Sequence, residues 1–216
     1  MRRTTRSLLT ILLLSLVLLQ VGGVVDFGAE ASEIRDDFFD LDSRDAADAP
    51  QTTPDVGTSQ PDAEARALSP SLLERLVHEA VNEERQAQGL SRVDFDPDLA
   101  VVARYHSRDM ARDDYFAHAS PEGETLSDRY GLFGYDCYIS TGTLTYTKGG
   151  ENIYYTSFGG TSYTEAEIAE RTVTGWMESP SHRENLLRPY WEQEGIGVWV
   201  KEEDGRTHVY VTQNFC

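Results

Sequence analysis

Hydrophobic residues recur at intervals of three and four along residues 69–89, which is the spacing of one face of an α-helix. The run Ser71-Leu72-Leu73-Glu74 has the form of a capping box, and Gly89 follows the last hydrophobic position as a C-terminal signal. The face predicted to point inward contains Leu72, Leu73, Leu76, Val77, Ala80 and Val81. We therefore expect the folded domain to begin near Ser69 with an amphipathic helix.

A second helix is predicted after Asp96-Pro97, because proline is favoured in the first turn of a helix. It ends at Arg112-Asp113-Asp114 and leads into a short loop that contains His118. A third, short helix is expected over residues 123–130. The hydrophobic stripe of the second helix consists of Leu99, Val102, Ala103, His106 and Met110.

The remainder of the chain combines one more helix with strands. Residues 164–177 have helical periodicity, with Ile168, Ala169, Val173 and Trp176 expected to face inward. Residues 144–147 are a possible strand, and residues 151–155 are a strand or an extended loop end. Two strands over 195–201 and 208–214 flank Asp204-Gly205, a strong hairpin signal. Helices followed by a terminal antiparallel hairpin predict a layered α+β domain.

The N-terminal part of the chain divides into two segments ahead of this domain. Residues 1–25 begin with three arginines and continue with an uncharged, leucine-rich run from Ser7 to Val25, which is typical of a signal peptide or an N-terminal membrane anchor. Cleavage near Ala31 and retention in the membrane are both open. Residues 26–68 are acidic and contain three prolines, as expected for a disordered linker. The folded domain, residues 69–216, is then outside the cytoplasm.

The charge balance narrows the classes of partner. The net charge is −18, with 37 acidic and 19 basic residues. Nucleic acids and anionic lipid surfaces attract basic proteins, so we expect no nucleic acid partner and membrane contact only through the N-terminal apolar segment. Lys148 and Lys201 are the two lysines of the chain. A strongly acidic surface that is poor in lysine favours a halophilic origin, because high salt screens self-repulsion.

Two cysteines, Cys137 and Cys216, are candidates for a disulfide in an exported protein. Their spacing alone does not show that they meet. No C-x-x-C motif is present, which disfavours a zinc knuckle or a thioredoxin-like centre.

Three residues at loops or element ends have the chemistry of a metal site. His118 lies in the loop after the second helix, Glu151 follows a glycine-rich stretch, and His182 follows the helix break at Ser179-Pro180-Ser181. Two imidazoles and one carboxylate would leave a zinc ion open to water or substrate. The alternative is three unrelated loop residues that cap backbone groups.

Other candidates have simpler interpretations. His106 and His78 are expected to be hydrogen-bonded packing residues within helices, and His208 a surface residue. The sequence contains neither the G-x-S-x-G nor the H-E-x-x-H motif of hydrolases. The numerous tyrosines could line a ligand groove, but they are more typical of the core and its edges.

Several motifs, in order, resemble the CAP superfamily of cysteine-rich secretory proteins, antigen 5 and pathogenesis-related proteins. Asn82, Arg85 and Gly89 are similar to the family's opening helix, and residues 116–121, FAHASP, to its histidine turn. Gly150-Glu151-Asn152-Ile153 matches the family's G-E-N-I motif, and residues 176–187, WMESPSHRENLL, resemble its prokaryotic form of the second histidine motif. The resemblance covers about residues 70–216.

This resemblance implies a three-layer α-β-α sandwich with a cleft of two histidines and two glutamates that binds zinc or another divalent metal in some members. His118, Glu151 and His182 match three of these positions. The fourth is Ser179 here, and Glu178 is one residue early, so a complete set of four ligands is not expected. Members of the family share no general enzymatic activity. The expected function is an extracellular binding or signalling module for a lipid, glycan or protein, with a weak metal cleft; the alternatives are a metal-dependent hydrolase and a lipid or sterol carrier.

Overall fold

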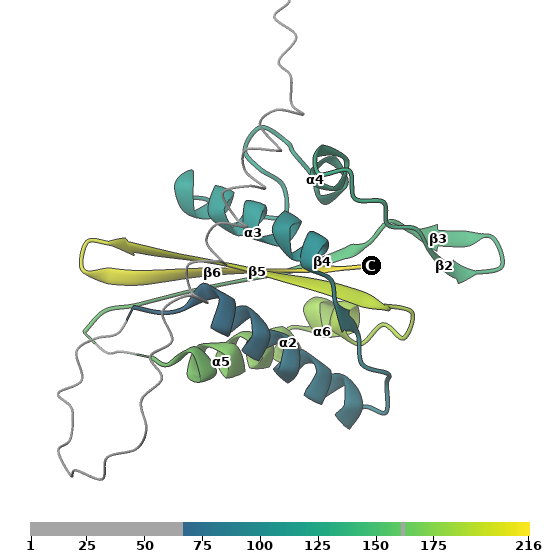
Figure 1. Ribbon diagram of the computed structural model, residues 1–216, viewed down its shortest axis with the longest axis horizontal. Coiled ribbons are helices and arrows are strands. Elements are labelled where there is room, and N and C mark those ends of the chain that lie inside the picture. Colours follow the sequence, from purple (N-terminus) through teal and green to yellow (C-terminus); the bar gives the residue numbers. More distant parts are fainter. Residues whose placement is uncertain (1–66, 161–162) are drawn as a thin grey trace, which may run out of the picture.

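A four-stranded sheet lies between two helical layers in the computed structural model, which describes residues 67–160 and 163–216 (Figure 1). The strand order is β1-β5-β6-β4, with β1 parallel to β5 and the other pairs antiparallel. The strands are β1 (Asp94–Phe95), β4 (Gly150–Phe158), β5 (Gln193–Glu203) and β6 (Arg206–Phe215). A separate hairpin of β2 (Ile139–Gly142) and β3 (Thr145–Thr147) extends away from the sandwich (Figure 1).

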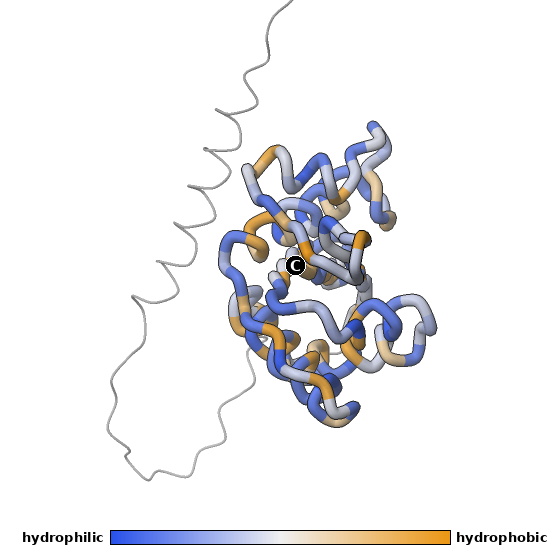
Figure 2. Tube along the Cα trace, turned by 90° about the vertical axis from the view of Figure 1, so that its right-hand side faces the viewer, coloured by the Kyte–Doolittle hydropathy of each residue, from blue (hydrophilic) through white to orange (hydrophobic). Residues whose placement is uncertain are grey.

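The helices cover both faces of this sheet. One layer contains α2 (Pro70–Ala87), α5 (Glu165–Glu178) and α6 (Pro180–Leu186); the other contains α3 (Pro97–Arg112) and α4 (Leu126–Leu132) (Figure 1). Hydrophobic and hydrophilic residues alternate along the helices, as amphipathic helices that cover a sheet require (Figure 2). The arrangement confirms the predicted α+β fold, a three-layer α-β-α sandwich.

The predicted division of the N-terminal region stays a prediction, because residues 1–25 and nearly all of 26–68 lie outside the described residues. Among residues 67–160 and 163–216, no helix combines the length and the hydrophobicity of a membrane-spanning segment.

Most of the predicted elements are present, with shifted ends. Helix α2 is capped by Ser69, whose hydroxyl accepts a hydrogen bond from the backbone of Leu72, so the predicted capping box at Ser71 is wrong. Glu74 instead turns inward, where its carboxylate binds Arg104 of α3 and the backbone N–H of Val198. Helix α4 begins three residues later than predicted, because Thr125 and Asp128 form its capping box.

The largest core lies between the sheet and the layer of α2, α5 and α6. Trp176 is fully buried there, and its indole N–H donates to the backbone carbonyl of Ile153 in β4 at 3.0 Å. The predicted inward residues of α5 are all buried. The buried residues of this core include Leu73, Val77, Val81, Ile168, Val173, Ile196, Val198, Val209 and Val211.

On the opposite face, two glycines let α3 lie directly on β5. A Cβ atom added to Gly195 would be 2.2 Å from the backbone nitrogen of Ala100, and one added to Gly197 would be 2.0 Å from that of Arg104. Two strand residues advance about 6.6 Å and four helix residues about 6 Å. Gly195 therefore lies opposite Ala100, and Gly197 lies opposite Arg104, one helical turn further along α3. This close approach sets the height of α3, and with it the position of His106.

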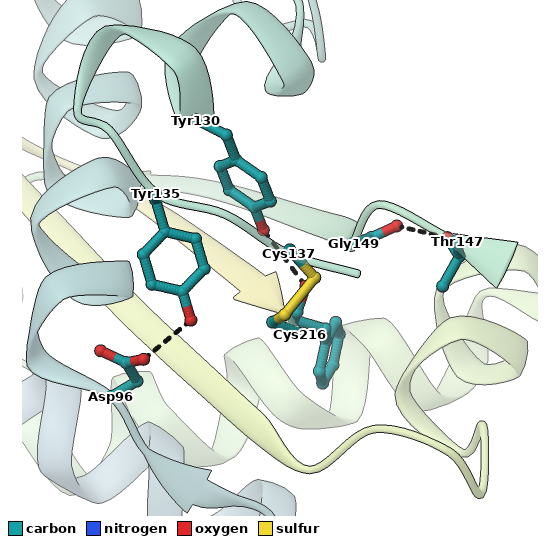
Figure 3. The surroundings of a disulfide bond; sticks show 8 residues. Asp96, Tyr130, Tyr135, Cys137, Thr147, Gly149 and Cys216 are labelled. Atoms are coloured by element: carbon teal, nitrogen blue, oxygen red, sulfur yellow. Dashed lines mark hydrogen bonds between the residues drawn. A yellow bond between two sulfur atoms is a disulfide. The ribbon is translucent and has the colours of Figure 1, made fainter. Parts of the chain in front are cut away.

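The predicted disulfide between Cys137 and Cys216 is formed, with a Cα–Cα distance of 5.6 Å (Figure 3). It joins the last residue of the chain to the segment after α4. The hydroxyl of Tyr130 donates to the carbonyl of Phe215 beside it (Figure 3). A cross-link between residues 79 positions apart restricts the unfolded chain and stabilises the domain by on the order of 4 kcal/mol.

Candidate functional site

Glu151 is the centre of the candidate site and lies near the start of β4, an edge strand of the sheet. It pairs with Asn214 across the ladder to β6. Its side chain is only 4% exposed and points towards the layer of α3 and α4, where it meets His106 and Arg129. Among the described residues no further strand pairs with β4, so the loop before α4 can reach this carboxylate and helix α6 can reach the backbone of Glu151.

The residues on either side of Glu151 attach β4 to α6. A Cβ atom on Gly150 would be 2.8 Å from the Asn185 side chain, so glycine is needed for the close approach of α6. The amide of Asn185 donates to the backbone carbonyl of Glu151 at 3.1 Å. Asn152 points to the other face of the sheet, where its amide donates to the carbonyl of His182 and to Gln213. The G-E-N motif therefore fixes the backbone of Glu151 and the position of α6 together.

Both carboxylate oxygens of Glu151 already have partners. The Nδ1–H of His118 donates to Oε1 at 2.8 Å, and the guanidinium of Arg129 donates to Oε2 at 2.7 Å. Arg129 is fully buried and also donates to the backbone carbonyl of His118 at 3.2 Å. Arg129 thus holds both the carboxylate and the loop that carries His118.

These contacts keep Glu151 ionised. Burial raises the pKa of its carboxyl, but the hydrogen bond from His118 and the charge of Arg129 outweigh burial, so the pKa lies below its ordinary value. His106 approaches the same carboxylate, with 3.9 Å between Nε2 and Oε1, and donates to the carbonyl of Ala117 at 3.1 Å. Burial lowers the pKa of His106 to about 4, so its imidazole is neutral at pH 7.

His182 completes the rim of the site on α6. Ser179 caps both α5 and α6, which confirms the predicted helix break. The ring centroids of His182 and His118 are 6.4 Å apart, and burial together with the charge of His118 lowers the pKa of His182. The side chain of His118 is 57% exposed. The exposed His118 and the partly buried His182 therefore lie side by side next to the buried Glu151–Arg129 pair.

The donor atoms present fit a metal ion poorly. Among residues 67–160 and 163–216, no group of three or more His, Cys, Asp or Glu residues is arranged to hold a metal. Glu178, the alternative for the fourth family position, is solvent-exposed at the end of α5, and Ser179 lies 3.5 Å from Ser181 through their hydroxyl oxygens. A metal that used Glu151 would have to compete with a buried guanidinium for the same carboxylate.

Two residues of the site, Arg129 and His106, were not predicted to belong to it. His106 is a buried, hydrogen-bonded helical residue as expected, but it also contacts the functional carboxylate. Its place on the inward stripe of α3 was the available signal. No local pattern marks Arg129, because its carboxylate partner is 22 residues away on another element. The remaining histidines lie elsewhere: His78 binds buried Glu194, and His208 binds the hydroxyl of Tyr155.

We expect the stability of the domain to decrease between pH 6.5 and pH 4 because of His106. The unfolded histidine takes up a proton in this range, whereas the folded one stays neutral until about pH 4, so acid favours unfolding. The shift in the pKa of His106 lowers the free energy of unfolding by about 3 kcal/mol between pH 6.5 and pH 4. Urea unfolding at several pH values measures it, and His106→Gln should flatten the profile. Burial raises the pKa of Glu194, so this residue makes the domain more stable as the pH falls. Its contribution is the same in the wild type and in His106→Gln and therefore does not affect the comparison. Parallel profiles for the two proteins would contradict this assignment.

Comparison with known proteins identifies this architecture. A family model described as "CAP: Cysteine-rich secretory protein family" matches residues 78–215. The chain belongs to the CAP family. This confirms the resemblance carried by the histidine turn, the G-E-N-I motif and the second histidine motif, which all lie within the matched residues.

Two relatives from Bacillus subtilis (strain 168) are similar to this CAP protein. Uncharacterised protein YkwD is 30% identical over 171 residues, which are 76% of this chain and 58% of the relative. Uncharacterised membrane protein YlbC is 32% identical over 142 residues, which are 66% of this chain and 34% of the relative. The match therefore spans less than two thirds of the length of either relative.

A solved structure has the same fold. An extracellular protein containing a SCP domain from Bacillus anthracis str. Ames aligns with a TM-score of 0.50 and 28% sequence identity, over 74% of this chain and 44% of that one. An extracellular location of this CAP protein agrees with that relative and with the disulfide formed here.

Proposed function

We propose that this CAP protein is an extracellular, non-enzymatic binding or signalling module that receives its ligand at the surface formed by His118 and His182. The observation that supports this proposal is the state of Glu151, whose two carboxylate oxygens are bound by His118 and Arg129. A site whose buried charge is balanced internally is suited to recognition through the hydrogen-bonding groups of the two histidines beside it.

The same observation disfavours the metal-dependent hydrolase. A general base needs an oxygen within reach of the water that it activates. Both oxygens of Glu151 already accept a hydrogen bond, so a water would have to share Oε1 with His118 or displace the buried guanidinium of Arg129 from Oε2. Displacing Arg129 would leave a buried charge unpaired, which is strongly unfavourable. The neutral imidazole of His106 lies beside the carboxylate but donates its Nε2–H to Ala117. The polar groups of His106, Arg129 and Glu151 are therefore bound within the protein and are not positioned to activate a water.

The N-terminal segment would deliver the module to the outside of the cell. The apolar run of residues 7–25 would be cleaved after export or keep the domain at the membrane, with residues 26–68 as a spacer. One relative is itself described as a membrane protein, which is consistent with the second of these outcomes.

Zinc titration of the full chain by calorimetry at pH 7 tests the proposal. We expect weak binding, with a dissociation constant in about the millimolar range, because Arg129 and His118 occupy the carboxylate that zinc would need. His208→Ala serves as a control, since this histidine lies on β6 against Tyr155. One zinc per chain at micromolar affinity, lost in both His118→Ala and His182→Ala and accompanied by hydrolysis of a peptide substrate, would contradict the proposal.

A further inference from the structure

A concave site lies on the same side of the sheet as the Glu151 carboxylate, beyond the C-terminal end of α3. It is a pocket of about 310 Å³, the lower end of the size range of small-molecule sites. Tyr155 follows Glu151 by four residues on β4, so the pocket is about 13 Å further along the strand than Glu151. It therefore has its own lining and goes beyond the function proposed above. Its walls include the aromatic residues Tyr115, Phe116, Tyr155 and Tyr210 and the acidic residues Asp114 and Glu203.

The aromatic rings form a preorganised surface around Tyr155. The centroid of its ring is 4.8 Å from that of Tyr210 and 6.0 Å from that of Phe116. The hydroxyl of Tyr155 is hydrogen-bonded to Nδ1 of His208 at 2.8 Å, and that of Tyr115 donates to Asp109 at 2.6 Å. These bonds hold the hydroxyl ends of the two tyrosines. Tyr155 and Phe116 are large hydrophobic residues that remain exposed.

The charges at this pocket sum to a negative value. Asp114 and Glu203 both accept from Nζ of Lys201, at 2.9 Å and 3.1 Å. One ammonium therefore faces two carboxylates, which leaves one negative charge in excess. Among the described residues, those that line the pocket include no lysine or arginine. The side chain of Asp114 is 70% exposed, so an incoming cation can approach it from solvent.

We propose that this pocket binds an organic cation with a quaternary ammonium group, such as the trimethylammonium group of choline. The negative faces of aromatic rings attract such a cation, and the excess carboxylate charge adds to this attraction. A quaternary ammonium has no N–H group, so it needs no hydrogen-bond acceptors and suits a wall of rings. An anionic ligand would be repelled by the carboxylates of Asp114 and Glu203, and a neutral ligand would gain no attraction from them.

The test uses choline and its uncharged isostere 3,3-dimethylbutan-1-ol, each titrated into the full chain and followed by NMR of the tyrosine rings. The two probes have the same shape and differ in charge. We expect saturable binding of choline that shifts Tyr155 and Tyr210, and binding of the isostere that is at least about tenfold weaker, a difference of ~1.4 kcal/mol. Absence of saturation with choline, or equal binding of the two probes, would overturn the proposal.

Variants separate the rings from the charge. Tyr155→Leu removes the central ring, and we expect choline binding to weaken about tenfold. Glu203→Gln removes one lining carboxylate and should weaken choline binding severalfold without changing that of the isostere. Glu202→Gln is the matched control, because successive strand residues point to opposite faces, and the Glu202 carboxylate accepts from Thr207 instead. Equal effects of the Glu203 and Glu202 variants would show that only overall charge matters and would reject the pocket as the binding site.

Discussion

Replacement of Arg129 by methionine is expected to destabilise the domain by about 3–5 kcal/mol, because it leaves the carboxylate of Glu151 buried and unpaired. Arg129 also donates to the carbonyls of His118 and Glu124, so the loop between α3 and α4 loses its attachment as well. For a domain of this size the loss corresponds to a fall in melting temperature of ~10 °C. Thermal and urea unfolding measure it.

Arg112→Met is the matched control for this change. Arg112 also pairs with carboxylates, those of Asp109 and Asp113, but its side chain is 64% exposed. Exposed ion pairs contribute about 0–1 kcal/mol, so the control should remain close to the wild type. A double-mutant cycle with Glu151→Gln isolates the pair: the double variant should be more stable than the sum of the single effects predicts, by about 1–3 kcal/mol. Additive effects would show that Arg129 and Glu151 do not depend on each other.

Gly197→Ala is expected to destabilise the domain by about 3 kcal/mol or more, since the added methyl group would lie 2.0 Å from the backbone nitrogen of Arg104. The atoms in the way belong to the backbone of α3, which cannot move aside as a flexible side chain can. The helix would have to rise from β5. We therefore expect lower stability in urea unfolding and a displaced His106, visible as a change in its NMR titration.

Gly131→Ala provides the comparison for this prediction. Gly131 lies in α4, and apart from its two chain neighbours and the backbone of its own helix, no atom lies within 4 Å of the position that its Cβ would occupy. Alanine is a better helix former than glycine, so this variant should be neutral or more stable by up to about 1 kcal/mol. If Gly197→Ala were as stable as Gly131→Ala, the direct packing of α3 on β5 would be wrong.

The helices and the terminal hairpin could be predicted from sequence because their signals are local. The Asp204-Gly205 turn has positive φ at both residues, which that pair of residue types favours. Strand β1 was not predicted, because two residues are too few for a periodic pattern and their pairing with β5 spans about a hundred positions. The start of helix α4 was predicted three residues too early, because it depends on the Thr125–Asp128 capping box rather than on hydrophobic spacing.

The candidate site was predictable only where a motif marks it. His118, Glu151 and His182 lie in family motifs, and the structure brings His118 into contact with Glu151 and places His182 beside His118. The ion pair between Glu151 on β4 and Arg129 on α4 joins two different elements, so no spacing in the sequence could reveal it. The halophilic origin inferred from the acidic, lysine-poor composition stays a prediction.

Glu151 is an ionised carboxylate whose charge is balanced within the protein by Arg129. Carbon-13 NMR of the Glu151 carboxyl group, followed as the pH is lowered, measures this directly. We expect the carboxyl to titrate below the ordinary glutamate value of about 4.3, because the hydrogen bond from His118 and the charge of Arg129 outweigh the effect of burial. A pKa at or above the ordinary value would show that the carboxyl is not paired with His118 and Arg129 in this way.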